Sequence, residues 1–398
     1  MNHMRVECVG KGFWQPKREV SFVEFVQEGH NLFGGAFTWP IMVLRRSALD
    51  HNLATLAAFC REYGFEFAPH GKTTMSPTLW QMQLDAGAWG ITLATVNQAL
   101  VAAKFGVPRV LLANEVLDPG PLRWLATQEG FDFSCFVDSL AGVRVLEQVG
   151  RPVSVFAELG FAGGRAGCRS ANELVQVVRA AKESGNVTVK GVAGYEGGLP
   201  DARAVAAYVD SLKQAALTLA AEGLLEEEVI VTAGGSTYFD VVADGLAGQW
   251  LPGHRLKVVL RSGAYLSHDD GFYLEHTPFL RVPEKGSLKA AIELWAQVTS
   301  TPEEGLVIAG MGKRDAPHDE GLPVPLRIRG LDGKVRNVSG AEVVRLNDHH
   351  AYVTGVQASA GELICFGISH PCTAFDKWRV IPVVEDDYRV SDLLRTYF

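Results

Sequence analysis

The sequence has few cysteines, no long apolar run and no excess of basic residues. Its six cysteines are scattered over 398 residues and form no CxxC pair, so a disulfide framework is not indicated in a chain this long. No stretch approaches the roughly 18 uninterrupted apolar residues of a membrane span. The first residues, MNHMRVECVGKGFW, contain no apolar core or cleavage site of a signal peptide. We therefore expect a reduced, cytoplasmic protein without a membrane partner.

The charge balance is acidic, with 37 Lys and Arg against 45 Asp and Glu and a net charge of −8. A nucleic-acid or anionic-membrane surface would need a basic face, and no dense Lys/Arg run is present. Hydrophobic residues make up 47% and charged residues 21%, as in soluble globular proteins. The length is sufficient for two domains with sizeable cores.

One pattern repeats between about residues 65 and 263. A short apolar, β-rich run is followed by an amphipathic segment of helical period and then by the next run. Eight runs are found, at Phe65–Pro69, Gly90–Thr95, Arg109–Asn114, Phe131–Asp138, Val153–Gly160, Val189–Tyr195, Val229–Gly235 and Lys257–Gly263. Continuous apolar strands that alternate with helices indicate a parallel sheet buried on both faces, and eight such units predict a closed α/β barrel of the TIM type.

The helices and the remaining segments can also be placed. Ser76 with Pro77, Ser139 and Asp201 are predicted helix starts. After about residue 280, short alternating runs are separated by Gly, Pro, Asp and Asn, which predicts a mostly β second domain. SFVEFV and PIMVL near the N-terminus are also β-like. We expect a barrel over 46–275 and a β domain built from 1–45 and 276–398.

Polar residues follow the predicted barrel strands, where active sites of such barrels lie. Lys72 comes after the first strand. In an apolar barrel mouth its amine would be partly desolvated, which lowers the pKa and favours Schiff-base chemistry. A surface lysine on a loop fits the position equally well.

The loops after strands seven and eight predict an anion site. Gly234 and Gly235 allow close backbone approach, and Ser236 precedes a helix with free N–H groups. Arg261, Ser262 and Gly263 follow strand eight, and these two loops are the usual phosphate cradle of such barrels. A GGS alone is also typical of a tight turn. Both loops together indicate a phosphorylated cofactor or substrate.

A metal site is a further hypothesis. In the extended segment FGISHPCTAF, His370 and Cys372 point to the same side and could be two ligands of a borderline-soft metal such as zinc. A hydrogen-bonded histidine beside a small buried cysteine is the alternative. His349 and His350 could be further ligands or lie on a surface turn.

Taken together, these residues resemble the fold-type III pyridoxal-phosphate (PLP) enzymes, the alanine-racemase-like class, and within it the D-serine dehydratase and D-threonine aldolase branch. The resemblance extends from about Trp39 to the C-terminus. It rests on APHGKTTMSP, ELGFAGGRAG, GVAGYEGG, TAGGST, VVLRSGAY, GMGKRDAPHDEGLP and SHPC. Departures occur at Ala309 before GMGK, in LNDHHAY, and in YLSHDDGFY, whose His268 and Asp270 are candidates for substrate contact.

The resemblance implies roles for individual residues. Lys72 would be the Schiff-base lysine, Arg165 would bond the phenolic oxygen of the cofactor, and Tyr195 would lie near its ring. The expected cofactor-binding set is Lys72, His70, Arg165, Tyr195, Gly234, Gly235, Ser236, Ser262, Gly263 and Tyr265. His370 and Cys372 would hold a divalent metal, with zinc as the expected ion. The HxC pair favours a dehydratase, since the aldolases usually have HxD.

The implied activity is metal-assisted β-elimination from a D-β-hydroxy amino acid, with D-serine going to pyruvate and ammonia in a cytoplasmic homodimer. Retro-aldol cleavage of the D-threonine aldolase type is the first alternative, and an amino-acid racemase is the second. A non-catalytic PLP carrier is a different class, which resembles a barrel alone.

Overall fold

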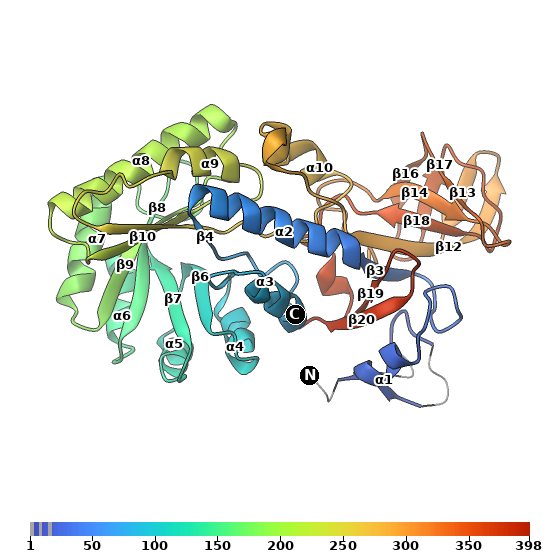
Figure 1. Cartoon of the computed structure of the whole chain (residues 1–398), viewed down its shortest axis with the longest axis horizontal. Helices are drawn as coiled ribbons and strands as arrows, with labels where there is room; N and C mark the ends of the chain where they lie inside the picture. The colour runs from blue at the N-terminus through green and yellow to red at the C-terminus, as the bar shows by residue number, and fades with distance from the viewer. Residues whose placement is uncertain (1–3, 8–9, 15–17) are drawn as a thin grey trace.

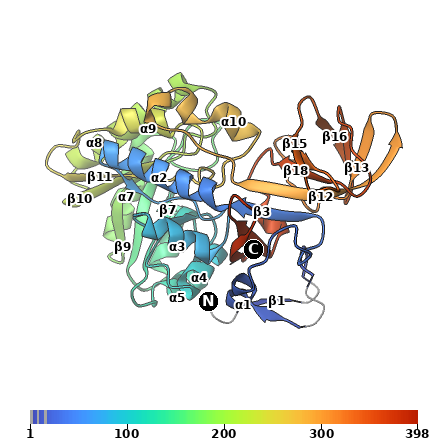
Figure 2. The same ribbon diagram turned by 45° about the vertical axis from the view of Figure 1, so that its right-hand side comes forward.

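The computed structural model describes residues 4–7, 10–14 and 18–398 of the chain. Figures 1 and 2 show two lobes, an α/β lobe and a lobe of antiparallel strands, connected through the region of α2, β3 and β12. Five cysteines in the described residues are free thiols, and Cys8 lies outside them.

The α/β lobe contains a parallel sheet of eight strands in the order β4-β11-β10-β9-β8-β7-β6-β5. A parallel bridge between His70 and Thr92, with a hydrogen bond from Gly71 N to Thr92 O of 2.8 Å, brings the two edges of this sheet together. The predicted α/β barrel is therefore confirmed. The strands are β4 Glu66–Phe67, β5 Ile91–Leu93, β6 Arg109–Glu115, β7 Asp132–Val137, β8 Val153–Leu159, β9 Val187–Gly194, β10 Glu228–Ala233 and β11 Arg255–Leu260.

Helices alternate with these strands along the chain and cover the outside of the sheet. In α7 the buried residues Leu174, Val177, Val178 and Ala181 recur at the spacing of one helical face. The helices are α2 Arg46–Tyr63, α3 Pro77–Asp85, α4 Val96–Lys104, α5 Pro119–Leu125, α6 Leu140–Glu147, α7 Ala171–Glu183, α8 Ala202–Ala221 and α9 Phe239–Leu246, followed by the short α10 Phe272–His276 and the 3₁₀ turns η1 Pro278–Leu280 and η2 Pro283–Lys285.

The predicted helix starts differ in how they are capped. The side chains of Ser139 and Asp201 accept hydrogen bonds from Gly142 N and Ala204 N at 3.2 and 2.8 Å. Ser76 precedes Pro77 as predicted, but its buried hydroxyl makes no capping bond.

The inside of the barrel is filled rather than hollow. A compact group of buried side chains lies there, separate from the larger core. Its members are Ala68, Leu111, Phe136, Phe156, Ala193, Ile230 and Val259. Because these residues fill the interior, any ligand site of the barrel has to lie at its mouth.

The second lobe is a ten-stranded, mostly antiparallel sheet. β3 pairs with β12 antiparallel and with β19 parallel, which brings the chain before the barrel into this sheet. The strands are β3 Ile41–Arg45, β12 Ile292–Glu303, β13 Leu306–Ala309, β14 Val324–Arg329, β15 Val335–Asn337, β16 Glu342–Leu346, β17 Ala351–Thr354, β18 Leu363–Gly367, β19 Val380–Val384 and β20 Val390–Arg395, with the 3₁₀ turn η3 Phe375–Lys377 before β19.

One N-terminal prediction is wrong. SFVEFV forms the helix α1 Phe22–Gln27 rather than a strand, after the two-residue strands β1 Arg5–Val6 and β2 Val20–Ser21. Ser21 Oγ accepts from Glu24 N at 3.1 Å and caps the helix. Phe22 and Phe25, three residues apart, are both buried. Capping and this spacing outweigh the β propensity of a six-residue run.

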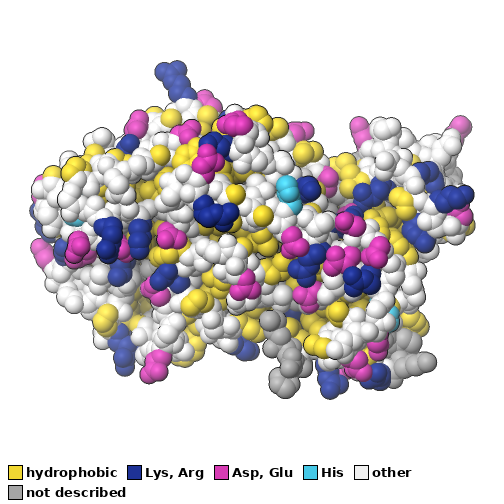
Figure 3. Space-filling view, viewed as in Figure 1, with side chains coloured by type: hydrophobic (Ala, Val, Ile, Leu, Met, Phe, Trp, Pro, Cys, Tyr) yellow, Lys and Arg dark blue, Asp and Glu magenta, His cyan; other side chains and the backbone are white. Residues whose placement is uncertain are grey.

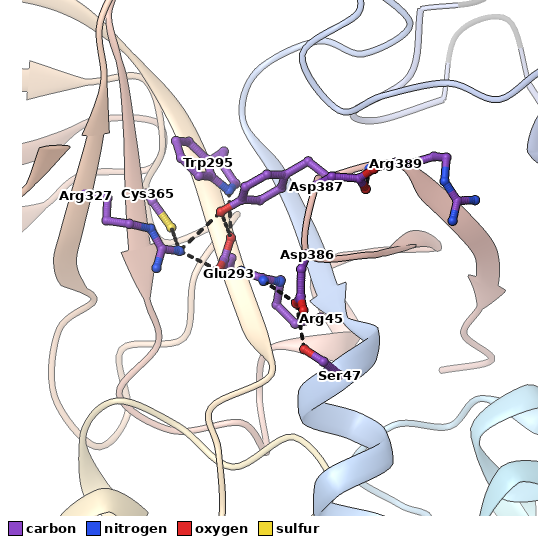
Figure 4. Close-up of polar contacts among 10 residues, drawn as sticks. Arg45, Ser47, Glu293, Trp295, Arg327, Cys365, Asp386, Asp387 and Arg389 are labelled. Carbon is purple, nitrogen blue, oxygen red and sulfur yellow. Dashed lines mark hydrogen bonds and ion pairs between the residues drawn. The ribbon is translucent and has the colours of Figure 1, made fainter. Parts of the chain in front are cut away.

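A buried carboxylate connects several strands of the second lobe (Figure 4). Glu293 on β12 is 5% exposed. One of its oxygens accepts from Arg45 Nη1 at 2.9 Å and from Arg327 Nη2 at 2.5 Å. The other accepts from Trp295 Nε1 and Tyr388 Oη, each at 3.0 Å. Burial alone would raise the pKa of Glu293, but the two arginines outweigh it and lower the pKa.

The surface carries charges of both signs. On the face in Figure 3, Lys and Arg side chains are interspersed with Asp and Glu. Among the described residues, no helix combines the length and apolar character required to cross a bilayer.

Candidate active site at the mouth of the barrel

Lys72 lies in the loop after β4, half-buried, on the wall of a cavity of about 110 Å³. Burial lowers the pKa of its amine, and the nearby Arg165 and Arg261 lower it further, whereas Cys372 acts in the opposite direction. An amine with a lowered pKa is a better nucleophile and base near neutral pH. The surface-lysine alternative does not fit this position.

Two buried polar atoms on the same cavity have no protein partner in the described part of the chain. They are Nδ1 of His70 and Nη1 of Arg261. Arg261 is 3% exposed and donates through Nη2 to Gly194 O. Buried polar groups are nearly always paired in folded proteins. The unfilled donor of Arg261 therefore fits a ligand with an acceptor in this cavity.

The two predicted anion-binding loops meet. Ser236 Oγ accepts from Gly263 N at 3.3 Å and from Ala264 N at 3.1 Å, and Ser262 Oγ donates to it at 3.3 Å. A Cβ atom at Gly263 would lie 2.5 Å from His70 Cβ. Only glycine permits this approach, which packs the strand-eight loop against the loop that carries Lys72.

The glycine turn after β10 already binds a carboxylate. Gly234, with φ of 95°, and Gly235 both direct backbone N–H groups to the side chain of Glu196. A Cβ at Gly235 would lie 3.1 Å from the Tyr195 ring. This turn therefore accepts anionic groups at close range.

Arg165 and Tyr195 form the outer wall. The Arg165 guanidinium lies 4.4 Å from the centroid of the Tyr195 ring, and both residues also line an adjoining hollow of about 210 Å³. Burial and the neighbouring Glu196 raise the pKa of the Tyr195 hydroxyl, so it stays protonated near neutral pH.

Glu158, at the end of β8, lies on the floor of both hollows. Burial and the neighbouring Glu115 raise its pKa to about 8. Glu158 is therefore largely protonated at pH 7 and can donate as well as accept.

His370 and Cys372 belong to the loop after β18 and lie beside the lysine loop. Thr73 Oγ1 is 3.9 Å from Cys372 Sγ. His370 Nδ1 is 2.9 Å from Asp319 Oδ2, and Thr373 Oγ1 donates to Asp319 Oδ1 at 2.9 Å. A carboxylate that holds one ring nitrogen of a histidine leaves the other free to bind a metal.

This pair has no third partner of the same kind. Among the described residues, no group of three or more His, Cys, Asp and Glu side chains is arranged to hold a metal ion. The two side chains therefore leave coordination positions for water or substrate.

The remaining candidates do not line the cavity beside Lys72. Tyr265 is buried, and its hydroxyl accepts from Gln83 at 3.0 Å. His349 and His350 are exposed in the turn between β16 and β17, where His349 Nδ1 is 3.7 Å from Asp315. Asp270 packs against Gly367, away from the lysine loop.

His268 lies behind the cradle and is 2% exposed, with φ of 47°. It lines a small cavity with Ser236 and Ser262. Burial lowers the pKa of its imidazole to about 4.

Sequence reasoning missed two residues of this region, Asp319 and Tyr273. Both lie in segments, GMGKRDAPHDEGLP and YLSHDDGFY, whose polar composition was itself a signal. A separate cavity of about 310 Å³ lies between the N-terminal segment and β19–β20, and none of the strand-end residues lines it.

The fold and part of the sequence resemble known proteins. Residues 291–384 match the family described as "Putative serine dehydratase domain". D-threonine aldolase from Filomicrobium marinum superposes with a TM-score of 0.76 at 22% identity, covering 90% of this chain and 94% of that one. An alanine racemase from Clostridium difficile 630 superposes with a TM-score of 0.63 at 13% identity, over 91% and 99% of the two chains. The fold is that of the alanine-racemase-like, fold-type III PLP enzymes.

Further similar proteins are named for reactions of 3-hydroxyaspartate. The 3-hydroxy-D-aspartate aldolase of Paracoccus denitrificans (strain Pd 1222) is 26% identical over 71% of this chain and 74% of its own length. D-threo-3-hydroxyaspartate dehydratase from Delftia sp. HT23 superposes with a TM-score of 0.71 at 21% identity, over 90% and 97% of the chains. A variant of a dehydratase of that name, with a cysteine replaced by alanine, is described as the metal-free form.

Proposed function

We propose that the chain is a PLP-dependent, metal-assisted lyase that eliminates water from a D-β-hydroxy amino acid, with D-serine giving pyruvate and ammonia. The observation that carries the proposal is the meeting of two loops. Thr73 Oγ1 lies 3.9 Å from Cys372 Sγ, so the lysine of the barrel and the His–Cys pair of the β lobe border one space.

The barrel mouth fits PLP in three respects. Lys72 supplies an amine with a lowered pKa. Ser236, Gly263 and Ala264 converge in the cradle, which suits a phosphate. Nη1 of Arg261 is a buried donor without a partner among the described residues, and it suits an acceptor atom of the cofactor ring.

Individual residues of the chain have separate roles in the proposed reaction. When bound, PLP supplies electron withdrawal from Cα of the substrate, which acidifies the α-proton. Lys72 Nζ removes that proton as the general base. Arg165 and Tyr195 border the cofactor on the outer side, where a guanidinium favours a negative oxygen.

His370 and Cys372 would hold a divalent metal, zinc in this proposal, whose Lewis acidity assists departure of the β-hydroxyl. Asp319 fixes the imidazole of His370 for this purpose. The hydroxyl leaves with a proton as water. The resulting 2-aminoacrylate takes up water and yields pyruvate and ammonia.

Retro-aldol cleavage is the second candidate, because two of the relatives are aldolases. It requires removal of the hydroxyl proton and cleavage of the Cα–Cβ bond instead of the Cβ–O bond. A metal bound to the hydroxyl assists either reaction, so the two differ in their products.

A product assay on D-serine, D-threonine and 3-hydroxy-D-aspartate, with L-serine as the stereochemical control, separates the candidates. The proposal predicts pyruvate and ammonia from D-serine and much slower turnover of L-serine. Faster release of glycine and acetaldehyde from D-threonine would replace the dehydratase by an aldolase. Interconversion of D- and L-serine without ammonia would indicate a racemase.

The proposal includes a homodimer in the cytoplasm, as the resemblance to fold-type III enzymes implies. Sedimentation analysis of the purified protein tests the dimer.

A further inference from the structure

Tyr273 is a tyrosine of the site that the proposed reaction has not used. It lies on α10, just after YLSHDD, and is held by Asp269. The Asp269 carboxylate, 1% exposed, accepts from Gly271 N, Tyr273 N and Leu274 N at 3.1, 2.9 and 3.2 Å. These three bonds fix the start of the short helix and with it the direction of the Tyr273 side chain.

The same segment is attached to the loop of the His–Cys pair. Asp270 N donates to Ile368 O at 2.9 Å and Phe272 N to Ser369 O at 2.8 Å. A Cβ at Gly271 would lie 2.7 Å from Ser369 Cα, so only glycine allows this contact. The Tyr273 ring consequently lies 5.7 Å from the His370 ring, between centroids.

The hydroxyl end of Tyr273 faces the cradle. Tyr273 lines the small cavity behind the anion-binding loops together with Ser236, Ser262 and Ala264. Its hydroxyl interacts with the side chain of Ser236. A phenol hydroxyl in this place can donate a hydrogen bond.

We propose that Tyr273 is a cofactor-binding residue whose hydroxyl donates to the PLP phosphate at the point where Ser236 Oγ, Gly263 N and Ala264 N converge. This inference rests on the proposed function and adds a side-chain donor to the cradle. Tyr265, the tyrosine expected there from the sequence, has its hydroxyl bonded to Gln83 instead.

The test compares two ligands that differ only in the phosphate. PLP and pyridoxal are titrated into protein freed of cofactor, and binding is followed by absorbance. A hydrogen bond to a charged group contributes about 1.5–3 kcal/mol, so Tyr273→Phe should weaken PLP binding about tenfold or more. The affinity for pyridoxal should stay unchanged.

Tyr63→Phe is the matched control, because it also removes one tyrosine hydroxyl bond, to Asp244 at 2.6 Å, remote from the cradle. It should bind PLP like the wild type. Ser236→Ala, and its combination with Tyr273→Phe, form a cycle that keeps the test decisive if one variant is unstable. The double variant should lose less affinity than the sum of the single losses.

Each outcome has a defined meaning. A wild type that binds no PLP would overturn the proposed function, and the role of Tyr273 with it. A wild type that binds PLP, with a Tyr273→Phe variant of equal affinity or equally weakened for both ligands, would overturn the role of Tyr273 alone.

Discussion

Replacing Glu293 by glutamine tests what holds the strands of the second lobe together. The carboxylate receives four hydrogen bonds, from Arg45, Arg327, Trp295 and Tyr388. An amide has one acceptor oxygen, and its NH₂ group would face donors where the second oxygen was. Glu293→Gln therefore removes the charge and leaves buried donors unpaired, although the side-chain shape is kept.

The size of the effect follows from burial. Breaking a buried ion pair by removing one partner costs about 3–5 kcal/mol. With an unfolding entropy of about 2.1 cal/mol/K per residue, a chain of 398 residues should melt about 4–6 °C lower. The stability lost on Glu293→Gln is greatest above the ordinary pKa of a carboxyl group. The reason is that the folded protein lowers the pKa of Glu293, so the stabilising contribution of its charge disappears as the pH falls through that lowered pKa.

Differential scanning calorimetry at pH 7 measures this shift. Asp386→Asn is the matched control, since Asp386 also binds Arg45, at 2.7 Å, but its side chain is 73% exposed. Its melting temperature should fall much less. A Glu293→Gln protein that melts within 1 °C of the wild type, or above Asp386→Asn, would refute the stabilising role of this carboxylate in the second lobe.

Two further predictions concern the site and its surroundings. Cys372→Ala should lower kcat/KM about 100-fold or more while PLP absorbance persists, and prolonged chelation should have the same effect. The control is Cys60→Ala, which removes a buried thiol on α2. Full activity of metal-free protein would exclude a metal from the reaction. Burial and the neighbouring Asp269 and Glu293 raise the pKa of Asp270 to about 7. The protonated carboxyl group of Asp270 therefore stabilises the fold fully below about pH 4, and this contribution is lost as the pH rises through about 7. The melting temperature of Asp270→Asn minus that of the wild type should therefore be larger at pH 8 than at pH 5. The same difference at both pH values would contradict the raised pKa of Asp270.

Much of the barrel could be predicted because buried parallel strands form continuous apolar runs. The run VSVFAELG became β8 Val153–Leu159 within one residue, since both of its faces are covered. SFVEFV, by contrast, was assigned to the wrong class. Two phenylalanines three positions apart fit one face of a helix, but six residues are too short a pattern to decide the class, and the decisive factor was the cap supplied by Ser21.

Contacts of the candidate site were predictable where they follow from position on the barrel. Ser236 and Gly263 follow neighbouring strands, so their meeting is a property of the fold. The partner of His370 could not be placed in the same way. Asp319 is 51 residues away in sequence, in a loop whose path depends on the packing of the whole β lobe. Tyr273 likewise depends on backbone bonds between α10 and the loop after β18.

The central claim is that Lys72 carries the cofactor. Purified protein should show visible absorption that borohydride abolishes, and the reduced adduct should be found by mass spectrometry on the peptide containing Lys72. Lys72→Ala should bind no cofactor that borohydride can fix. An adduct on Lys104 or Lys313, or labelling that persists in Lys72→Ala, would contradict the assignment.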